Sequence, residues 1–151
     1  MCQVLLVDDE PRTLLSFSTL LKSSGIREVT SIEDSRKVIP FLEKESAALV
    51  VLDLSMPFIP GQDLLVEIQQ RFPGIPVVVM TAVNEIDTAV ECMRNGAIDY
   101  LVKPVENNRF LSSVNRALEI YQLKQELSHL KKYVLSDRLE NPQHFSHIVT
   151  A

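Results

Sequence analysis

Short apolar runs alternate with amphipathic segments along this chain, and that alternation restricts the fold more than any other feature of the sequence. Three runs are continuous and rich in β-branched or aliphatic residues: residues 3–7 (QVLLV), 48–52 (ALVVL) and 76–80 (PVVVM). Such runs are typical of strands that are buried on both faces, as in a parallel sheet. Residues 28–30 (EVT) and 99–103 (DYLVK) are weaker strand candidates.

Helical patterns fill the intervals between these runs, at residues 11–23, 34–45, 62–71 and 85–94 and again from about residue 106. Pro11 suits a first helical turn, whereas Pro40 should kink or shorten its segment. Asn95-Gly96 should end the fourth helix. Five strands that alternate with five helices predict an α/β fold with a parallel sheet and right-handed crossovers.

The apolar residues of each helical segment lie near one face and form its candidate core side. The first segment contributes Leu14, Leu15, Phe17, Leu20 and Leu21, and the fourth contributes Ile86, Val90 and Met93. The last helix begins with a sheet-facing set: Phe110, Leu111, Val114, Ala117 and Leu118.

Composition indicates an ordinary globular protein. The chain has 151 residues, 46% of them hydrophobic, which suits one domain with an extension. A formal charge of −5 gives no general electrostatic reason to bind nucleic acid. Cys2 and Cys92 form neither a disulfide framework nor a metal-ligand pair, so we expect a reducing cytoplasm. We see no signal peptide and no apolar run that is long enough to span a membrane.

Polar residues with strong chemistry stand where the predicted strands end. Asp8 and Asp9 follow the first strand, Asp53 follows the third, Thr81 the fourth and Lys103 the fifth. Each alone would more often be a turn or cap residue. A parallel sheet, however, brings all these strand ends to one edge. Three converging carboxylates need a counter-charge, and Mg²⁺ beside a place for a phosphoryl group would supply it.

Four motifs in this order resemble the receiver domain of bacterial two-component response regulators. They are VDDEP (7–11), VLDLSMP (51–57), VMTA (79–82) and YLVKP (100–104). The resemblance covers residues 1 to about 118. It implies a flavodoxin-like, doubly wound five-stranded parallel sheet with strand order 2-1-3-4-5, here followed by a long C-terminal helix.

The resemblance also implies a role for each matching position. Asp53 would be the phosphoacceptor, which takes a phosphoryl group from a sensor histidine kinase. Asp8 and Asp9, together with Asp53 and the backbone carbonyl of Ser55, would hold Mg²⁺. The domain would then be a regulatory phosphoacceptor that catalyses only its own phosphorylation and dephosphorylation, and no enzyme in the ordinary sense.

Three residues of the fourth and fifth strand ends complete the implied site. Lys103 would pair with one phosphoryl oxygen, and the hydroxyl of Thr81 would donate to another. Tyr100 matches the aromatic residue that switches together with Thr81, although an ordinary half-buried strand residue is an open alternative. Pro104 follows a cis peptide in this family.

The last helix continues past the end of a receiver domain with a heptad pattern. Its a and d positions are Ile120, Leu123, Leu127, Leu130 and Val134. In a parallel pair, Glu119 and Glu126 at g would face Lys124 and Lys131 at e, and both contacts are attractive. We therefore expect a homodimer through this seam. A helix that packs on its own domain, or on a missing one, is the alternative.

These patterns divide the chain into a receiver domain (1–118), a helical linker (119–140) and the start of a missing downstream domain (141–151). The final stretch, LENPQHFSHIVTA (139–151), resembles the connector that enters the AAA+ ATPase domain of sigma-54-dependent transcription activators. That resemblance implies downstream ATPase and DNA-binding domains. The sequence contains no P-loop glycine motif, so we expect no ATPase activity in residues 1–151.

The function we expect is a phosphorylation switch in which changes at Thr81 and Tyr100 alter dimerisation and control a downstream ATPase domain. A Mg²⁺-dependent phosphohydrolase of the haloacid-dehalogenase type is the alternative. That family has a second aspartate two residues after its nucleophile, near the first strand. Here Ser55 takes that place, and Asp53 follows the third strand. A third possibility, a dimerisation module with a degenerate pocket, fits poorly with the intact set of Asp9, Asp53, Thr81 and Lys103.

Overall fold

The structure, a computed structural model, describes residues 2–82 and 86–140, and for 136–140 it describes the backbone alone. The chain divides into two compact units, residues 1–121 and 122–151. The predicted start of a downstream domain at 141–151 lies outside the described residues. None of the described helices combines the length and the hydrophobicity needed to cross a membrane.

The first unit is built on one five-stranded sheet in which every pair of neighbouring strands is parallel. The strand order is β2-β1-β3-β4-β5, which confirms the expected topology. The three central strands are buried along their whole length, because helices cover both faces. The strands are β1 (Val4–Val7), β2 (Val29–Ile32), β3 (Val50–Asp53), β4 (Val77–Thr81) and β5 (Asp99–Val102).

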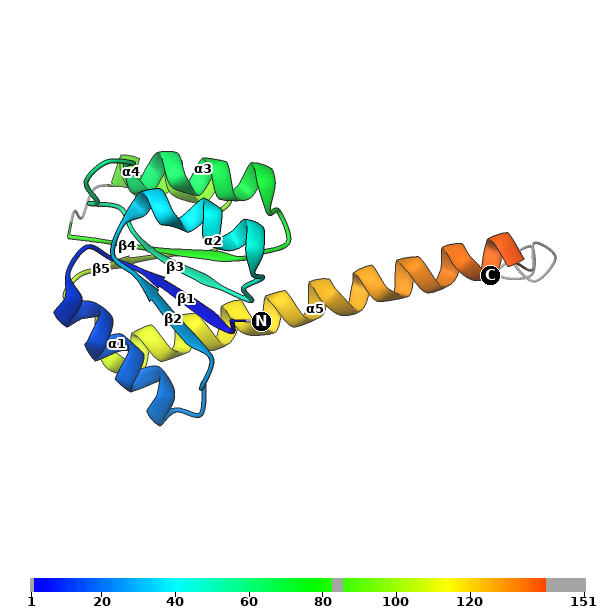
Figure 1. Ribbon diagram of the computed structural model, residues 1–151, viewed down its shortest axis with the longest axis horizontal. Coiled ribbons are helices and arrows are strands. Elements are labelled where there is room, and N and C mark those ends of the chain that lie inside the picture. The colour runs from blue at the N-terminus through cyan, green and yellow to red at the C-terminus, as the bar shows by residue number, and fades with distance from the viewer. Residues whose placement is uncertain (1, 83–85, 141–151) are drawn as a thin grey trace. The chain divides into compact units, whose positions relative to one another are not determined.

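Helices lie on both faces of this sheet. In Figure 1, α1 and the first part of α5 cover one face, and α2, α3 and α4 cover the other. The chain moves from β1 to β2 in one direction across the sheet and then to β3, β4 and β5 in the other. Because crossovers between parallel strands are right-handed, this change of direction places helices on both faces. The helices are α1 (Pro11–Ser23), α2 (Val38–Lys44, after a 3-10 turn η1, Ser35–Lys37), α3 (Gly61–Arg71), α4 (Ile86–Arg94) and α5 (Asn107–Glu140).

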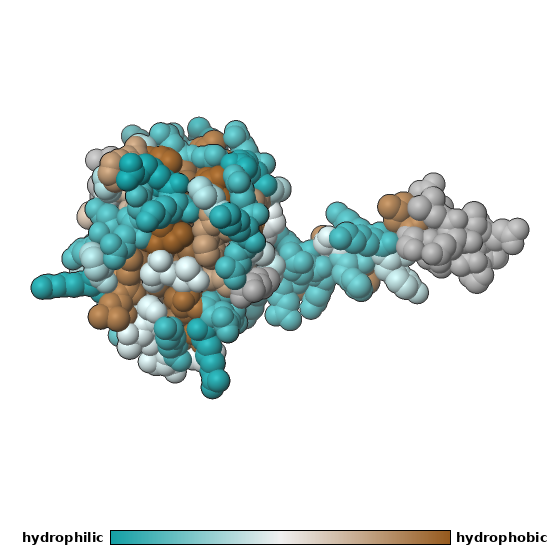
Figure 2. Space-filling model, in the orientation of Figure 1, coloured by the Kyte–Doolittle hydropathy of each residue, from teal (hydrophilic) through white to brown (hydrophobic). Residues whose placement is uncertain are grey.

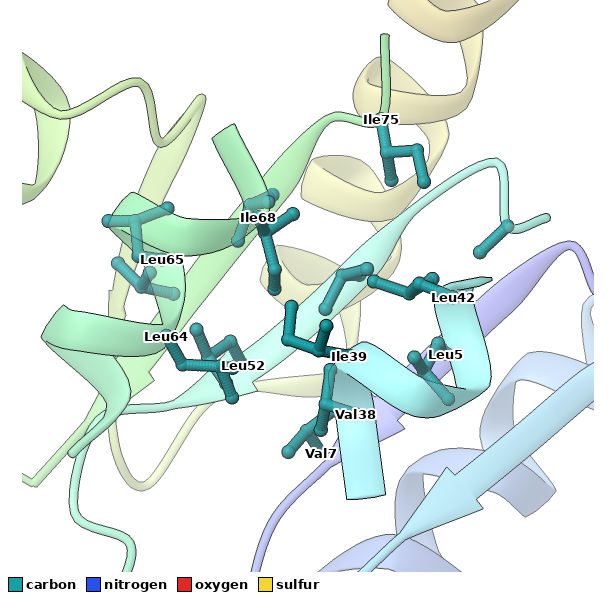
Figure 3. Packing of buried hydrophobic residues seen from close by; sticks show 14 of the residues in the cluster. Leu5, Val7, Val38, Ile39, Leu42, Leu52, Leu64, Leu65, Ile68 and Ile75 are labelled. Carbon is teal, nitrogen blue, oxygen red and sulfur yellow. The ribbon is translucent and has the colours of Figure 1, made fainter. Parts of the chain in front are cut away.

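Two hydrophobic cores form, one on each side of the sheet, because successive strand residues point to opposite faces. In the first core, side chains of β1 and β3 meet those of α2 and α3, as Figure 3 shows for Leu5, Leu52, Ile39 and Leu65. In the second core, Phe110 of α5 is fully buried. The two cores hold the strands from both faces of the sheet, and they therefore fix the position of the polar residues at the strand ends.

Two helix boundaries follow local backbone chemistry. The predicted helix at 34–45 is shortened, as expected from Pro40: η1 comes first, and Pro40 is the third residue of the seven-residue α2. A proline in the first helical turn removes no hydrogen bond, because those N–H groups have no partner within the helix. At the end of α4, Gly96 adopts φ +103°, and the N–H groups of Gly96 and Ala97 donate to carbonyls of the last turn.

The predicted core faces of two helices were wrong, that of α1 in part and that of α4 entirely. Leu15 of α1 is 70% exposed, although its neighbour Leu14 is buried. In α4 all three predicted residues are exposed, Ile86 to 81%, Val90 to 47% and Met93 to 46%, and Cys92 is the buried side chain instead. Periodicity identifies the most apolar face of a helix, but tertiary packing decides which face is buried, and small residues allow the closest approach to the sheet.

The described residues of the second unit, 122–140, are helical throughout. The seam residues Leu123, Leu127, Leu130 and Val134 are exposed, with exposed fractions of 45–63%. In the space-filling view, apolar residues lie among hydrophilic ones on the surface of this segment (Figure 2). Their exposure leaves these side chains available for the predicted seam, which stays a prediction.

Gly61 allows the start of α3 to approach the end of β3, and we predict that Gly61→Ala is destabilising. A Cβ at this position would lie 2.4 Å from the Leu54 Cα and 2.6 Å from the Asp53 carbonyl oxygen, so the backbone must shift. Overpacking of this kind typically costs about 1–3 kcal/mol. Urea unfolding at neutral pH should show this loss.

The matched control is Gly74→Ala, because a Cβ at Gly74 would have no atom within 4 Å. It should be neutral or slightly stabilising, by up to about 1 kcal/mol, since alanine restricts the unfolded chain. Equal losses in the two variants would contradict the close-approach argument.

Candidate metal and phosphoryl site

Three carboxylates converge at the carboxyl edge of the sheet. Asp8 directly follows β1, and Asp53 is the last residue of the adjacent strand β3, whose Leu52 pairs with Val7. Oxygen atoms of Asp8, Asp9 and Asp53 all lie within 4.8 Å of one another. Asp8 and Asp53 are buried, whereas Asp9 is exposed. The convergence expected from the strand ends is therefore present.

Each buried carboxylate is oriented by its own chain. Asp8 Oδ1 accepts a hydrogen bond from the Glu10 N–H at 2.9 Å, and Asp53 Oδ1 accepts one from the Ser55 N–H at 3.2 Å. Both bonds span two residues, the pattern of an Asx turn. One oxygen of each group is thus held by the backbone, and the Oδ2 atoms of both face Lys103.

Lys103 lies directly after β5, and its ammonium reaches both buried carboxylates. Its Nζ is 2.7 Å from Asp8 Oδ2 and 3.5 Å from Asp53 Oδ2. Burial alone would lower the pKa of Lys103, but the hydrogen bond to Asp8 and the charge of Asp53 raise it overall. Lys103 is therefore a cation at neutral pH. The peptide bond from Lys103 to Pro104 is cis, as the sequence resemblance implies.

The cluster is electrostatically unbalanced, because three carboxylates lie together and the Lys103 ammonium contacts only two of them, Asp8 and Asp53. Burial raises the pKa of Asp53 above its ordinary value, and the charges of Asp8 and Asp9 act in the same direction. The Ser55 N–H and Lys103 oppose this rise without reversing it. A donor set made of oxygen atoms with excess negative charge suits a hard divalent cation such as Mg²⁺.

Thr81 and Tyr100 lie on neighbouring strands beside the cluster. Thr81 is the buried last residue of β4, and Tyr100 is a half-buried residue of β5. Val79 pairs with Tyr100, and Thr81 pairs with Val102. Because side chains alternate along a strand, Thr81 and Tyr100 point to the same face as diagonal neighbours. This placement fits the sequence-based pairing of the two residues.

An open groove of about 470 Å³ runs beside Lys103, between α1 and the segment that leads into α5. Of the predicted site residues, Lys103 lines this groove. Its lining residues are Arg12, Thr13, Ser16, Phe17, Lys103, Pro104, Val105 and Asn107.

Sequence reasoning missed one group of contacts near the site, around the turn η1. Ser35 is buried and hydrogen-bonds to the loop between β3 and α3, 22 and 24 residues further along the chain. Phe58 in that loop has φ +72°, which is unusual for a bulky residue. Asp34-Ser35 resembles a helix start in the sequence, and no local signal indicates a contact with the later loop.

Comparison with known proteins identifies the class. The family described as the response regulator receiver domain matches residues 4–115, so this chain belongs to that family. It is 42% identical over 116 residues to the response regulator protein FleR of Pseudomonas aeruginosa, covering 76% of this chain and 24% of FleR. It is 33% identical over 121 residues to the DNA-binding transcriptional regulator NtrC of Klebsiella pneumoniae, covering 80% of this chain and 26% of NtrC.

A solved structure supports the same assignment. The solution structure of the beryllofluoride-activated NtrC4 receiver domain dimer matches with a TM-score of 0.75 and 31% identity, covering 80% of this chain and 99% of that one. The chain spans about a quarter of the length of the two curated relatives. These comparisons support a phosphorylation-dependent signalling switch and give no support to a phosphohydrolase of the haloacid-dehalogenase type.

Neutralising Asp53 should stabilise the metal-free protein at high pH. The raised pKa means that the folded state binds this proton more tightly than the unfolded chain, so stability falls as pH rises above the ordinary value of 3.8. We predict that Asp53→Asn is more stable than the wild type at pH 8 and that the difference narrows toward pH 4. Urea unfolding in chelator-treated buffer at several pH values measures this difference in the free energy of unfolding.

The control is Asp63→Asn, which removes an exposed carboxylate from the first turn of α3. Its loss should lower stability slightly, by about 0.3–1 kcal/mol, because it removes a favourable interaction with the helix dipole. A destabilised Asp53→Asn at pH 8 would contradict the electrostatic account of the cluster.

Proposed function

We propose that residues 1–118 are a phosphorylation switch in which Asp53 accepts a phosphoryl group from a sensor histidine kinase. The observation that carries this proposal is the position of Asp53 at the end of β3, buried, with its Oδ2 3.5 Å from the Lys103 ammonium. A carboxylate oxygen attacks phosphorus and forms an acyl phosphate. The bond from phosphorus to the histidine nitrogen breaks, and its electron pair stays on the imidazole.

Asp8, Asp9 and Asp53, with the backbone carbonyl of Ser55, would hold Mg²⁺. Support comes from the all-oxygen donor set and from the unbalanced charge of the cluster. When bound, the ion would neutralise negative charge on the transferring phosphoryl group. Asp9 is exposed and so can exchange water for the metal at little cost.

Lys103 and Thr81 would bind oxygens of the phosphoryl group once it is on Asp53. Lys103 already faces the carboxylate oxygens, so it can pair with a phosphoryl oxygen after small movements of its flexible stem. Thr81 stands at the end of the neighbouring strand β4 and would donate its hydroxyl to another oxygen. Tyr100, its diagonal neighbour, would change its packing with it. The groove beside Lys103 offers the kinase access to the site.

The segments after the receiver domain would transmit the structural change at Thr81 and Tyr100. We assign residues 119–140 to a helical linker and residues 141–151 to the start of a downstream domain. The curated relatives support this division, because they extend far beyond the part that this chain matches, and NtrC is named as a DNA-binding transcriptional regulator. Downstream ATPase and DNA-binding domains, and a cytoplasmic location, stay predictions from the sequence.

The linker would form a parallel homodimer through Ile120, Leu123, Leu127, Leu130 and Val134. The exposure of the last four residues supports this assignment. The dimeric state of the similar NtrC4 receiver domain is consistent with it. Two heptads bury few leucines, each worth roughly 1.5–3 kcal/mol, so the contact is weak enough for phosphorylation to change.

Phosphorylation should occur at Asp53 and should require the acid pair. Incubation with acetyl phosphate and Mg²⁺ is expected to add one phosphoryl group to the wild type and none to Asp53→Asn, which lacks the nucleophile. Asp9→Ala should react much more slowly, because it lacks a proposed metal ligand. Intact-mass spectrometry over time measures all three.

Two matched variants serve as controls. Asp63→Asn removes an exposed carboxylate of α3, and Glu10→Gln removes the carboxylate next to the acid pair. Both should react like the wild type. An equal mass gain in Asp53→Asn would exclude Asp53 as the acceptor, and a normal rate in Asp9→Ala would remove Asp9 from the metal site.

Dimerisation should depend on the seam. Sedimentation of the wild type is expected to show a monomer–dimer equilibrium whose constant changes when beryllofluoride mimics the phosphoryl group. Leu123→Glu with Leu130→Glu should abolish the dimer, because it places like charges at both d positions.

Gln122→Glu with His129→Glu is the control, since it adds charge with the same seven-residue spacing at exposed c positions. That variant should dimerise like the wild type. A dimer that survives the leucine substitutions would place the interface elsewhere. A dimerisation constant that does not change with beryllofluoride would mean that the seam holds two chains together without responding to phosphorylation.

A further inference from the structure

We propose that Ser35 is a positioning residue for the metal site, an inference that rests on the proposed function. Its buried hydroxyl holds the loop between β3 and α3, residues 54–60, in the conformation that keeps Ser55 beside Asp53. Ser35 touches neither the metal nor the phosphoryl group in this proposal. It acts through the backbone of the loop.

The contacts that carry the proposal are two hydrogen bonds made by one hydroxyl. Ser35 Oγ donates to the Pro57 carbonyl oxygen at 2.8 Å and accepts from the Ile59 N–H at 3.1 Å. The residue is 1% exposed, so water cannot replace these bonds. A hydroxyl can donate and accept at the same time, whereas an alanine can do neither.

The residue between these two anchor points is strained. Phe58 adopts φ +72°, a left-handed conformation that is a genuine outlier for a bulky side chain. Such conformations persist only where the surrounding structure enforces them, and they concentrate at functional sites. The hydroxyl of Ser35 bonds the backbone immediately before and immediately after Phe58, so it bridges the strained residue.

Asp34 and Arg36, on either side of Ser35, form a second contact with Phe58 at the surface. The guanidinium of Arg36 lies over the Phe58 ring, 3.6 Å from its centroid. Asp34 orients that guanidinium with bonds of 2.8 and 3.0 Å. The Phe58 ring is 65% exposed, so this contact, unlike that of Ser35, is open to solvent.

The ends of the loop and Met56 are fixed by other means, Met56 by burial in the first core, which leaves the segment around Phe58 to Ser35. At one end, Asp53 Oδ1 accepts from the Ser55 N–H. Across the base, the Gly61 N–H donates to the Leu54 carbonyl oxygen at 3.2 Å. Without Ser35, Phe58 can relax to a negative φ. That rotation would move the chain that follows Ser55 and displace its carbonyl from the acid cluster.

If Ser35 only stabilised the fold, its loss would affect metal binding no more than the loss of any other buried serine. Ser113 provides that comparison. Ser113 is also a buried serine, and its hydroxyl donates to Asp99 Oδ2 at 2.8 Å, between α5 and β5. Ser113→Ala should therefore lose stability by a comparable mechanism. The Ser113 side chain makes none of the loop contacts described for Ser35.

The experiment uses the full chain and compares the wild type, Ser35→Ala and Ser113→Ala by NMR. In metal-free buffer, amide hydrogen exchange at Ile59 should be faster in Ser35→Ala alone. In a titration with Mg²⁺ alone, followed at the Ser55 amide, Ser35→Ala should bind about tenfold more weakly than the wild type, the lower end for residues that support metal ligands. Ser113→Ala should bind like the wild type.

A double variant, Ser35→Ala with Phe58→Gly, tests the strain directly. Glycine adopts positive φ without steric cost, so the double variant should recover most of the Mg²⁺ affinity, and it remains informative if Ser35→Ala alone does not fold. Failure to recover affinity would overturn the strain account.

The remaining outcomes separate this proposal from the proposed function. Fast exchange at Ile59 with unchanged Mg²⁺ affinity would overturn the positioning role and leave the metal site intact. Equal weakening in Ser113→Ala would reduce the effect to general destabilisation and also overturn it. A wild type that binds no Mg²⁺ would overturn the metal site itself, and this proposal with it.

Discussion

The ammonium of Lys103, held between two buried carboxylates, is the interaction on which the site depends. It joins the ends of β5, β1 and β3 through contacts of 2.7 Å to Asp8 and 3.5 Å to Asp53. Burial raises the pKa of Asp53, and the charges of Asp8 and Asp9 add to this rise, so the pKa stays above its ordinary value although Lys103 lies beside the carboxylate. In the proposed metal site, the same excess of negative charge would lower stability without metal and favour binding of a divalent cation.

The rigidity of the site comes from different sources in its different parts. The side chains of Asp8, Asp53 and Thr81 lie on or directly after strands packed between two cores, so they have little freedom. The loop after Asp53 leaves the sheet before α3 begins, and although Met56 is buried in the first core, the segment around the exposed Phe58 has less support. It depends on the hydroxyl of Ser35 and on the close approach of Gly61 to the end of β3.

Most of the fold and the acid cluster could be predicted from the sequence, and the misses have physical reasons. Continuous apolar runs identified the three central strands, and weaker patterns indicated the two outer ones. Parallel strands place their carboxyl ends at one edge, so Asp8, Asp53 and Lys103 were expected to converge. Ser35 could not be found this way, because its partners are backbone groups of a loop whose conformation no local pattern specifies. The outward face of α4 was missed because periodicity does not reveal which side of a helix meets the sheet.

The fold also explains how a change at the phosphoryl site can reach α5. The Lys103 N–H donates to the Thr81 carbonyl oxygen at 2.8 Å, so the two residues proposed to contact the phosphoryl oxygens are joined through their backbones. Asp99, at the start of β5, accepts hydrogen bonds from Arg109 and Ser113 at the root of α5.

Burial alone would raise the pKa of Asp99, but the hydrogen bonds from Arg109 and Ser113 lower it overall, so this anchor is charged at neutral pH. β5 is therefore bonded to the phosphoryl site at one end and to α5 at the other. Because close-packed layers deform little, we expect a displacement of Lys103 or Tyr100 either to shift the root of α5 or to break the Asp99 bonds. In the proposed switch, the first of these outcomes alters the orientation of the helix that carries the dimer seam.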